Sequence, residues 1–202
     1  MGACKPSPDM REGDHTVRML DAEARSVVIG PLTREDGAQR GLEWRSEVTA
    51  DDVGRVRTLV ASTGFFNAAE VEVAADLVTE RLTKGIRSGC EFVLAERGCS
   101  LAAFACYGPI YGTQDSFELY WIAVAPDEQG RGLGGEVYAR AEAAMREAGA
   151  KHIYADTSTS DRYAPTRGFY QSLGFSEQAR LADFYAPGDG KTVYVKGLTP
   201  SP

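Results

Sequence analysis

Residues 117–149 constrain the fold more than any other stretch of the chain. They begin with residues 117–124, a run of aromatic and β-branched side chains that suits a largely buried strand. Three glycines follow within the hexapeptide Gln129-Gly130-Arg131-Gly132-Leu133-Gly134. From Leu133 to Gly149, apolar side chains recur at the spacing of one helix face. The stretch therefore predicts a strand, a glycine turn and an amphipathic helix.

A glycine turn at the start of a helix is well suited to bind an anion. Glycine has no Cβ atom, so the backbone can approach a ligand closely and direct several N–H groups at it. The free N–H groups and the dipole of the following helix both favour negative charge. We therefore expect this segment to hold a ligand that carries phosphate.

The remaining hydrophobic pattern predicts an α/β fold. The expected order is one strand, two helices, three strands, a helix, a strand, a helix and two strands. Such an order predicts a central mixed sheet of about six or seven strands flanked by helices. Residues 1–41 are expected to form a flexible tail with one short edge strand at 26–29, and residues 42–198 a single folded domain.

Composition excludes several classes of partner. The net charge of −7 and a pI near 5.0 argue against a nucleic-acid surface. The four cysteines show no CxxC spacing and there are two histidines, so we expect no metal site. No apolar run approaches the roughly 20 residues of a membrane span, and no signal peptide is apparent. These features predict a cytoplasmic protein without a membrane partner.

One alternative is a dinucleotide-binding unit. Gly130, Gly132 and Gly135 satisfy its glycine spacing, and Asp156 ends the next predicted strand, where an acid would bind a ribose. However, residues 126–129 separate the strand from the first glycine. Only 46 of the 202 residues follow Asp156, too few for further βα units. Both features count against this alternative.

Two motifs resemble those of the GNAT-type N-acetyltransferases. Gln129-x-x-Gly132-x-Gly134 resembles the pyrophosphate-binding turn of that family, and residues 169–175, FYQSLGF, are similar to its second signature. The resemblance extends over residues 42–198. It implies a mixed sheet whose fourth and fifth strands splay apart to admit acetyl-CoA.

The resemblance also implies how acetyl-CoA would be held. Its pantetheine arm would pair with the main chain of Ile122 and Val124, as an added strand would. Its pyrophosphate would lie on the glycine turn and Arg131, although an exposed arginine with no such role is an equal alternative. The turn residues concerned are Gln129, Gly130, Arg131, Gly132, Gly134 and Gly135.

Two side chains are candidates for catalysis. Glu118 stands among apolar neighbours that would raise its pKa, which suits a base for an ammonium group, and its place resembles that of a glutamate base in some members of the family. Its alternative is a glutamate at the rim of the strand, paired with a surface cation. Tyr170 resembles the tyrosine that protonates the departing thiolate; its alternative is a packed tyrosine with a surface hydroxyl. Tyr163 departs from the family, because many members carry Asn there.

These features predict an acetyl-CoA-dependent N-acetyltransferase that acts on a primary amine of a small molecule or amino-acid-like acceptor. Neither motif contains a cysteine, so we expect direct attack in a ternary complex. An acidic and aromatic rim from Phe65, Phe66 and residues 183–185 would favour a cationic amine; its alternative is a solvated loop acid with buried aromatic residues. The alternative is a catalytically silent module that binds or senses acyl-CoA. A homodimer is one option that the family offers and the sequence does not decide.

Overall fold

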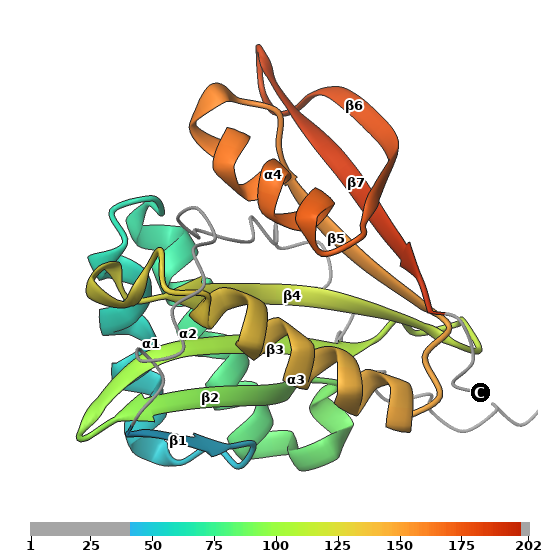
Figure 1. Cartoon of the computed structure of the whole chain (residues 1–202). Helices are drawn as coiled ribbons and strands as arrows, with labels where there is room; N and C mark the ends of the chain where they lie inside the picture. The colour runs from blue at the N-terminus through green and yellow to red at the C-terminus, as the bar shows by residue number, and fades with distance from the viewer. Residues whose placement is uncertain (1–40, 199–202) are drawn as a thin grey trace, which may run out of the picture.

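The fold is a seven-stranded mixed sheet with helices on both faces (Figure 1). The computed structural model describes residues 41–198, so the edge strand predicted at residues 26–29 lies outside the described residues. The strands are arranged in the order β1-β2-β3-β4-β5-β7-β6. All neighbours pair antiparallel except β4 and β5, which are parallel. The predicted mixed α/β sheet is confirmed.

The elements follow one another in the predicted order. The first half contains β1 (Leu42–Arg45), α1 (Ala50–Ser62), α2 (Ala68–Lys84), η2 (Gly85–Ser88), β2 (Glu91–Arg97), β3 (Ser100–Pro109) and β4 (Ser116–Val124). The second half contains η3 (Pro126–Glu128), α3 (Leu133–Glu147), β5 (His152–Ser158), η4 (Asp161–Tyr163), α4 (Ala164–Ser172), β6 (Ser176–Ala186) and β7 (Asp189–Gly197).

Both N-terminal helices begin at capping boxes. In α1 the Asp52 carboxylate accepts a hydrogen bond from the N–H of Thr49 at 2.7 Å. In α2 the side chain of Asn67 accepts from the N–H of Glu70 at 3.0 Å, and Glu70 accepts from the N–H of Asn67 at 2.7 Å. Such reciprocal bonds satisfy backbone donors that a helix start leaves open, so the sequence fixes these two boundaries locally.

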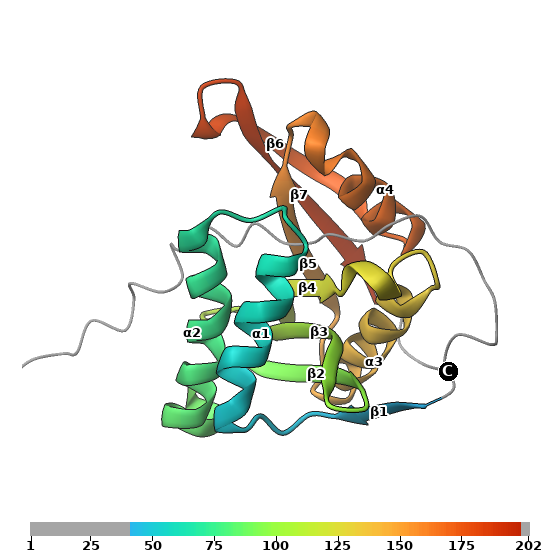
Figure 2. The same ribbon diagram turned by 90° about the vertical axis from the view of Figure 1, so that its left-hand side faces the viewer.

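The two faces of the sheet carry separate hydrophobic cores. Helices α1 and α2 pack on one face, against residues such as Phe92, Phe104 and Trp121 (Figure 2). Helices α3 and α4 pack on the other, where Val137 and Tyr170 belong to the same core as Ile122. We call these the α1/α2 face and the α3/α4 face. Any group in the sheet can therefore be assigned to one side or the other.

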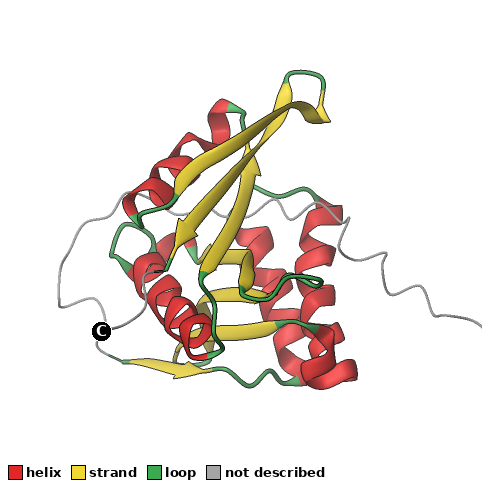
Figure 3. Cartoon of the chain, turned by 90° about the vertical axis from the view of Figure 1, so that its right-hand side faces the viewer, coloured by secondary structure: helices red, strands yellow, loops and turns green. Residues whose placement is uncertain are grey.

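The sheet is split between β4 and β5. Pairing runs only from the rung of Ser116 with His152 to the rung of Glu118 with Tyr154. Beyond that rung, β4 continues with β3 to Val124, whereas β5 continues with β7 to Ser158. The two strands diverge as the arms of a V (Figures 1 and 3). The splayed strands that the family resemblance implies are thus present.

A bulge in β4 determines which way its side chains point. Leu119 pairs with Tyr107 and Trp121 pairs with Cys106, so three residues of β4 lie opposite two of β3. Tyr120, the extra residue, joins Trp121 in the core of the α1/α2 face, while Leu119 lies in the opposite core. Glu118, one residue before Leu119, therefore lies on the α1/α2 face.

Candidate active site

The predicted glycine turn connects β4 to α3 and presents backbone donors. Gly130 and Gly132 have φ angles of 74° and 81°, a left-handed conformation that favours glycine. Gly132 is the N-cap of α3, and the first bond within the helix runs from the N–H of Glu136 to the carbonyl of Gly132 at 3.2 Å. The N–H groups of Leu133, Gly134 and Gly135 precede that bond and have no acceptor within the helix. The turn therefore has the donors that an anion requires.

The edge of β4 beside the split carries the two predicted main-chain positions. The N–H of Ala125 bonds to the carbonyl of Ala102 at 2.8 Å, so the backbone groups of Val124 and, by alternation, Ile122 point away from β3 and toward the split. The carbonyl of Val124 accepts a hydrogen bond from the side-chain amide of Gln129 at 3.0 Å. Gln129 therefore ties the turn to the strand edge, a role for its side chain that the motif did not reveal.

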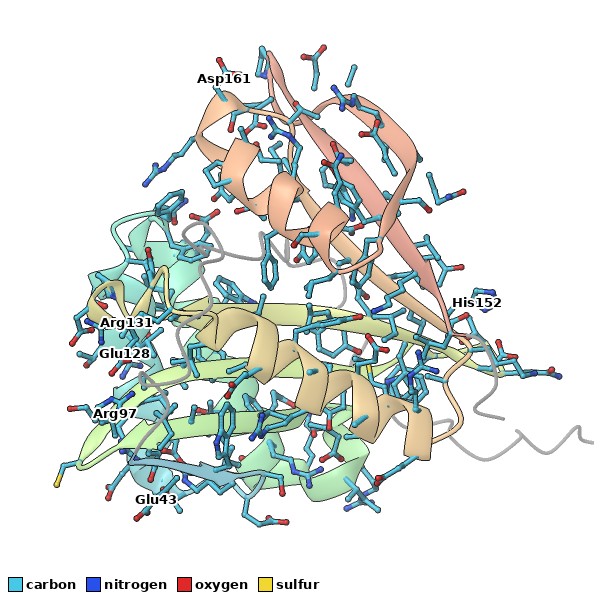
Figure 4. All side chains as sticks on the ribbon, viewed as in Figure 1. Glu43, Arg97, Glu128, Arg131, His152 and Asp161 are labelled. Atoms are coloured by element: carbon cyan, nitrogen blue, oxygen red, sulfur yellow. The ribbon has the colours of Figure 1, made fainter. Side chains whose placement is uncertain are left out.

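Arg131 lies in a charged cluster with Glu128 and Arg97 (Figure 4). Glu128 is 7% exposed, and its carboxylate accepts a hydrogen bond from Nε of Arg97 at 2.5 Å. The Arg131 side chain is 54% exposed and its Nη1 is 3.8 Å from the same carboxylate. Arg131 is thus only loosely paired beside the turn. Sequence reasoning missed Arg97, which comes from the far end of β2.

Glu118 lies on the last rung between β4 and β5 and has an altered proton affinity. Burial, reinforced by the negative charge of Asp156, raises the pKa of Glu118 to about 7, while Lys191 opposes the rise. The expected apolar environment is therefore only part of the cause. The ion pair of Lys191 is formed with Asp156 rather than with Glu118. A carboxyl group with this pKa can exchange protons near neutral pH.

Asp156 and Lys191 were not predicted as members of this site. Asp156 was considered only as the acid of a dinucleotide site. Ile153 and Ala155 of β5 point into the core of the α3/α4 face, so Asp156 lies on the α1/α2 face, as Glu118 does. Asp156 is 8% exposed and pairs with the ammonium group of Lys191 on β7. Alternation in β5 could have indicated its face, but not its proximity to Glu118.

Tyr170 lies on the other face of the split. It is fully buried, with its ring centre 5.4 Å from that of Phe175 and 5.5 Å from that of Tyr194. Its hydroxyl oxygen is buried too, so the alternative in which this hydroxyl lies at the surface is not observed. Glu118 and Tyr170 therefore lie on opposite faces of the sheet.

The predicted rim at residues 183–185 lies at the end of β6. Asp183 has a φ of 51°, and its carboxylate accepts a hydrogen bond from the N–H of Gly188 at 2.6 Å. This bond stabilises the turn that carries Phe184, whose side chain is 47% exposed. The ring of Phe184 lies 5.0 Å from Nζ of Lys191. Phe184 of the rim thus contacts Lys191, which in turn pairs with Asp156.

The other predicted aromatic residues connect the two halves of the molecule. Phe66 packs on Trp121 with ring centres 4.7 Å apart, while Phe65 meets the ring of Tyr163 at 6.1 Å. Arg162 lies 4.8 Å from the centre of the Phe65 ring and donates a hydrogen bond to the carbonyl of Gly64. Tyr163, where many family members carry Asn, is therefore used for packing between the α1–α2 loop and η4.

Comparison with known proteins identifies the family to which this chain belongs. A model of the acetyltransferase (GNAT) family matches residues 61–175, more than half of the chain. The chain belongs to the GNAT family of acetyltransferases. The match includes the glycine turn and ends at Phe175, the last residue of the second motif. The dinucleotide alternative is thereby wrong, and the single parallel strand pair of the described sheet agrees with that conclusion.

Individual GNAT relatives are similar over most of this chain. A protein from Desulfovibrio desulfuricans assigned to the GNAT family is 42% identical, with a TM-score of 0.77 over 78% of this chain and 99% of that one. The amino-acid acetyltransferase of Ectopseudomonas mendocina is 30% identical over 161 residues, which are 80% of this chain and 35% of that protein. This chain therefore spans about a third of the length of that curated relative.

A third similar structure contains acetyl-CoA. The structure of a Salmonella typhimurium protein with acetyl-CoA has a TM-score of 0.63 at 19% identity, over 80% of this chain and 96% of that one, which is a likeness of fold.

Within residues 41–198, His, Cys, Asp and Glu side chains nowhere gather in groups of three that could hold a metal ion. No helix in that range has both the length and the apolar content to cross a membrane.

Proposed function

We propose that the protein transfers the acetyl group of acetyl-CoA to a primary amine of a small molecule or amino-acid-like acceptor, by direct attack in a ternary complex. One observation carries the proposal. The split between β4 and β5 has a carboxyl group of pKa about 7, Glu118, on one face and the buried phenol of Tyr170 on the other. Acetyl transfer to an ammonium group needs one proton removed and one supplied.

The glycine turn and the edge of β4 would hold acetyl-CoA. The donors of residues 129–135 suit its pyrophosphate, and the outward backbone groups of Ile122 and Val124 suit its pantetheine amides. Arg131 adds a loosely paired cation beside the turn. Acetyl-CoA supplies an activated acetyl thioester, and the relative from Salmonella typhimurium that binds it supports this assignment.

Glu118 would receive the proton of the acceptor. An alkylammonium group has a pKa of about 10 and must lose a proton before its nitrogen can attack. A carboxylate with a pKa of about 7 accepts that proton more readily than an ordinary glutamate, yet half of it is ionised at neutral pH. Tyr170 would donate its phenolic proton to the departing sulfur, from the side on which α3 and α4 lie.

The acceptor would reach the split from the α1/α2 face. Leu181 and Phe184 of β6 are 44% and 47% exposed, Leu181 pairs in register with Lys191, and the Phe184 ring faces the Lys191 ammonium group. Apolar surface therefore lies beside the Asp156–Lys191 pair. A cationic amine on a partly apolar body would suit such a surface. The curated relative from Ectopseudomonas mendocina acts, by its name, on amino acids, which supports an amino-acid-like acceptor.

A ligand panel followed by an acceptor screen tests the proposal. Acetyl-CoA at 100 times its Kd should raise the free energy of unfolding by about 2.7 kcal/mol, measured by thermal shift beside CoA and NADH. A library of primary amines is then screened for release of free CoA thiol. Stabilisation by NADH alone would refute the cofactor assignment. Binding of acetyl-CoA without thiol release from any amine would favour a silent acyl-CoA-binding module.

A further inference from the structure

The ion pair of Asp156 with Lys191 stands beside the proposed base on the same face of the split. Glu118 shares its rung with Tyr154, and Asp156 is the next residue of β5 that points to the α1/α2 face. Lys191 pairs in register with Ser158, one step further along the same face, and reaches back to the Asp156 carboxylate. Three charged side chains from β4, β5 and β7 thus gather where β4 and β5 diverge.

We propose that Asp156 and Lys191 are positioning residues that set how readily Glu118 takes up the proton of the acceptor. The inference rests on the proposed role of Glu118 as the base. Asp156 disfavours a second negative charge beside it, and Lys191 offsets part of that repulsion. Burial makes the largest contribution to the raised pKa of Glu118, and the pair adjusts it.

The geometry restricts what Lys191 can do. Its ammonium group is held between the Asp156 carboxylate and the face of the Phe184 ring, whose centre is 5.0 Å away. The Lys191 side chain is 22% exposed and that of Asp156 is 10% exposed, so water screens the pair poorly. The arrangement therefore transmits a change of either charge to Glu118.

The groups that face Glu118 come from three strands. Tyr120 of β4 is a phenol whose pKa is raised by burial first and by Glu118 second, so it is neutral throughout the working range. Asp156 comes from β5 and Lys191 from β7. Burial raises the pKa of Asp156 itself, although Lys191 lowers it. Asp156 and Lys191 therefore both act on Glu118, with opposite signs.

Two substitutions should change the protonation of Glu118 in opposite directions. Asp156→Asn removes the repulsion, so the titration of Glu118 should move to lower pH by about one pH unit. Lys191→Gln removes the opposing cation, so the carboxyl pair should keep its proton to higher pH by a similar amount. Lys191→Arg keeps the charge and should restore the wild-type midpoint. Each midpoint is read by NMR from carboxyl-labelled glutamate in the full chain, with Glu118→Gln to assign the signal.

A second ion pair provides the matched controls. Lys196, also on β7, has its Nζ 2.5 Å from the carboxylate of Glu142 on α3. Lys196→Gln and Glu142→Gln remove the same kinds of charge from the opposite face, so they should leave the Glu118 midpoint unchanged. Equal shifts in these controls, or a Glu118 midpoint that neither Asp156→Asn nor Lys191→Gln moves, would overturn the inference.

The NMR titration and the activity measurement can fail separately. If acetyl transfer occurs, the acidic limb of the kcat/KM profile should move by the same amount and in the same direction as the NMR midpoint. Midpoints that move while the pH profile stays fixed would remove Glu118 from the role of base, and with it the inferred role of the pair. The expected result is that the NMR midpoint and the acidic limb of the kcat/KM profile move together, to lower pH in Asp156→Asn and to higher pH in Lys191→Gln.

Discussion

Glu118 of β4 lies directly opposite Tyr154 of β5 on the last rung that joins these two strands. The proposed base therefore stands at the vertex of the V, where the sheet changes from continuous to split. Beyond this rung β4 and β5 no longer pair, and each continues with its other neighbour. Under the proposed function, acceptor and acetyl-CoA would approach this split from different faces of one sheet.

Tyr170→Phe should lower kcat by about 100-fold, because the departing thiolate loses a positioned proton donor. The affinity for acetyl-CoA, measured by calorimetry, should change little, since the ring keeps its packing. Tyr194→Phe is the matched control. It removes a hydroxyl from the neighbouring ring, 5.5 Å away in the same core, and kcat should stay within twofold of wild type. Equal losses in both variants would show that packing, not proton donation, is affected.

Glu118→Gln should slow turnover and stabilise the fold at high pH. The folded pKa of about 7 lies above the ordinary value of 4.5, so this group's stabilisation is complete below pH 4.5 and is lost as pH rises through 7. The loss is about 3 kcal/mol in wild type, and the neutral amide avoids it. In urea unfolding, the free energy of unfolding of the variant relative to that of wild type should therefore rise between pH 5 and pH 8.

An exposed glutamate is the control for this pH dependence. The ion pair with Arg57 lowers the pKa of Glu72, whose side chain is 55% exposed. Glu72→Gln should therefore be slightly less stable than wild type above the ordinary glutamate range, by an amount that stays constant between pH 5 and pH 8 and disappears only at lower pH. If Glu118→Gln gained no stability between pH 5 and pH 8, the altered proton affinity of Glu118 would be refuted.

Gly132→Ala should weaken acetyl-CoA binding by more than tenfold. The φ of 81° disfavours alanine by about 1 kcal/mol, and relaxation of that strain would reorient the donors at the start of α3. Gly149→Ala, at the other end of the same helix, imposes a similar strain with a φ of 93° and open space around the added Cβ. Calorimetry should show normal acetyl-CoA affinity in this control at similar loss of stability.

Arg131→Ala should lower the affinity for acetyl-CoA about three- to tenfold, and the deficit should shrink as salt rises from 50 mM to 500 mM because screening weakens a charge contact. Arg57→Ala removes an arginine of comparable exposure that pairs with Glu72 on the α1/α2 side. Its affinity for acetyl-CoA should equal that of wild type at both salt concentrations. A salt-independent deficit in Arg131→Ala would argue against a phosphate contact.

The sequence predicted the elements whose signals are local. The glycine turn and the apolar stripe of α3 each act within a few positions, so the start of α3 was predicted at Leu133, where the helix begins. The family resemblance added the split sheet. Contacts between distant segments were missed, because no local pattern reveals which side chains meet. Arg97 with Glu128 is one case, and Asp156 with Lys191 is another.

The bulge at Tyr120 makes the length of β4 a functional requirement. If β4 alternated regularly back from Trp121, Glu118 would point to the α3/α4 face and Phe117 would take its place. Insertion of one residue between Glu118 and Trp121, without a second bulge, would therefore exchange a carboxylate for a phenyl ring at the vertex of the V. Insertion of two residues would restore the phase. Length variation within this strand should accordingly be tolerated in steps of two, a restriction that no single side chain imposes.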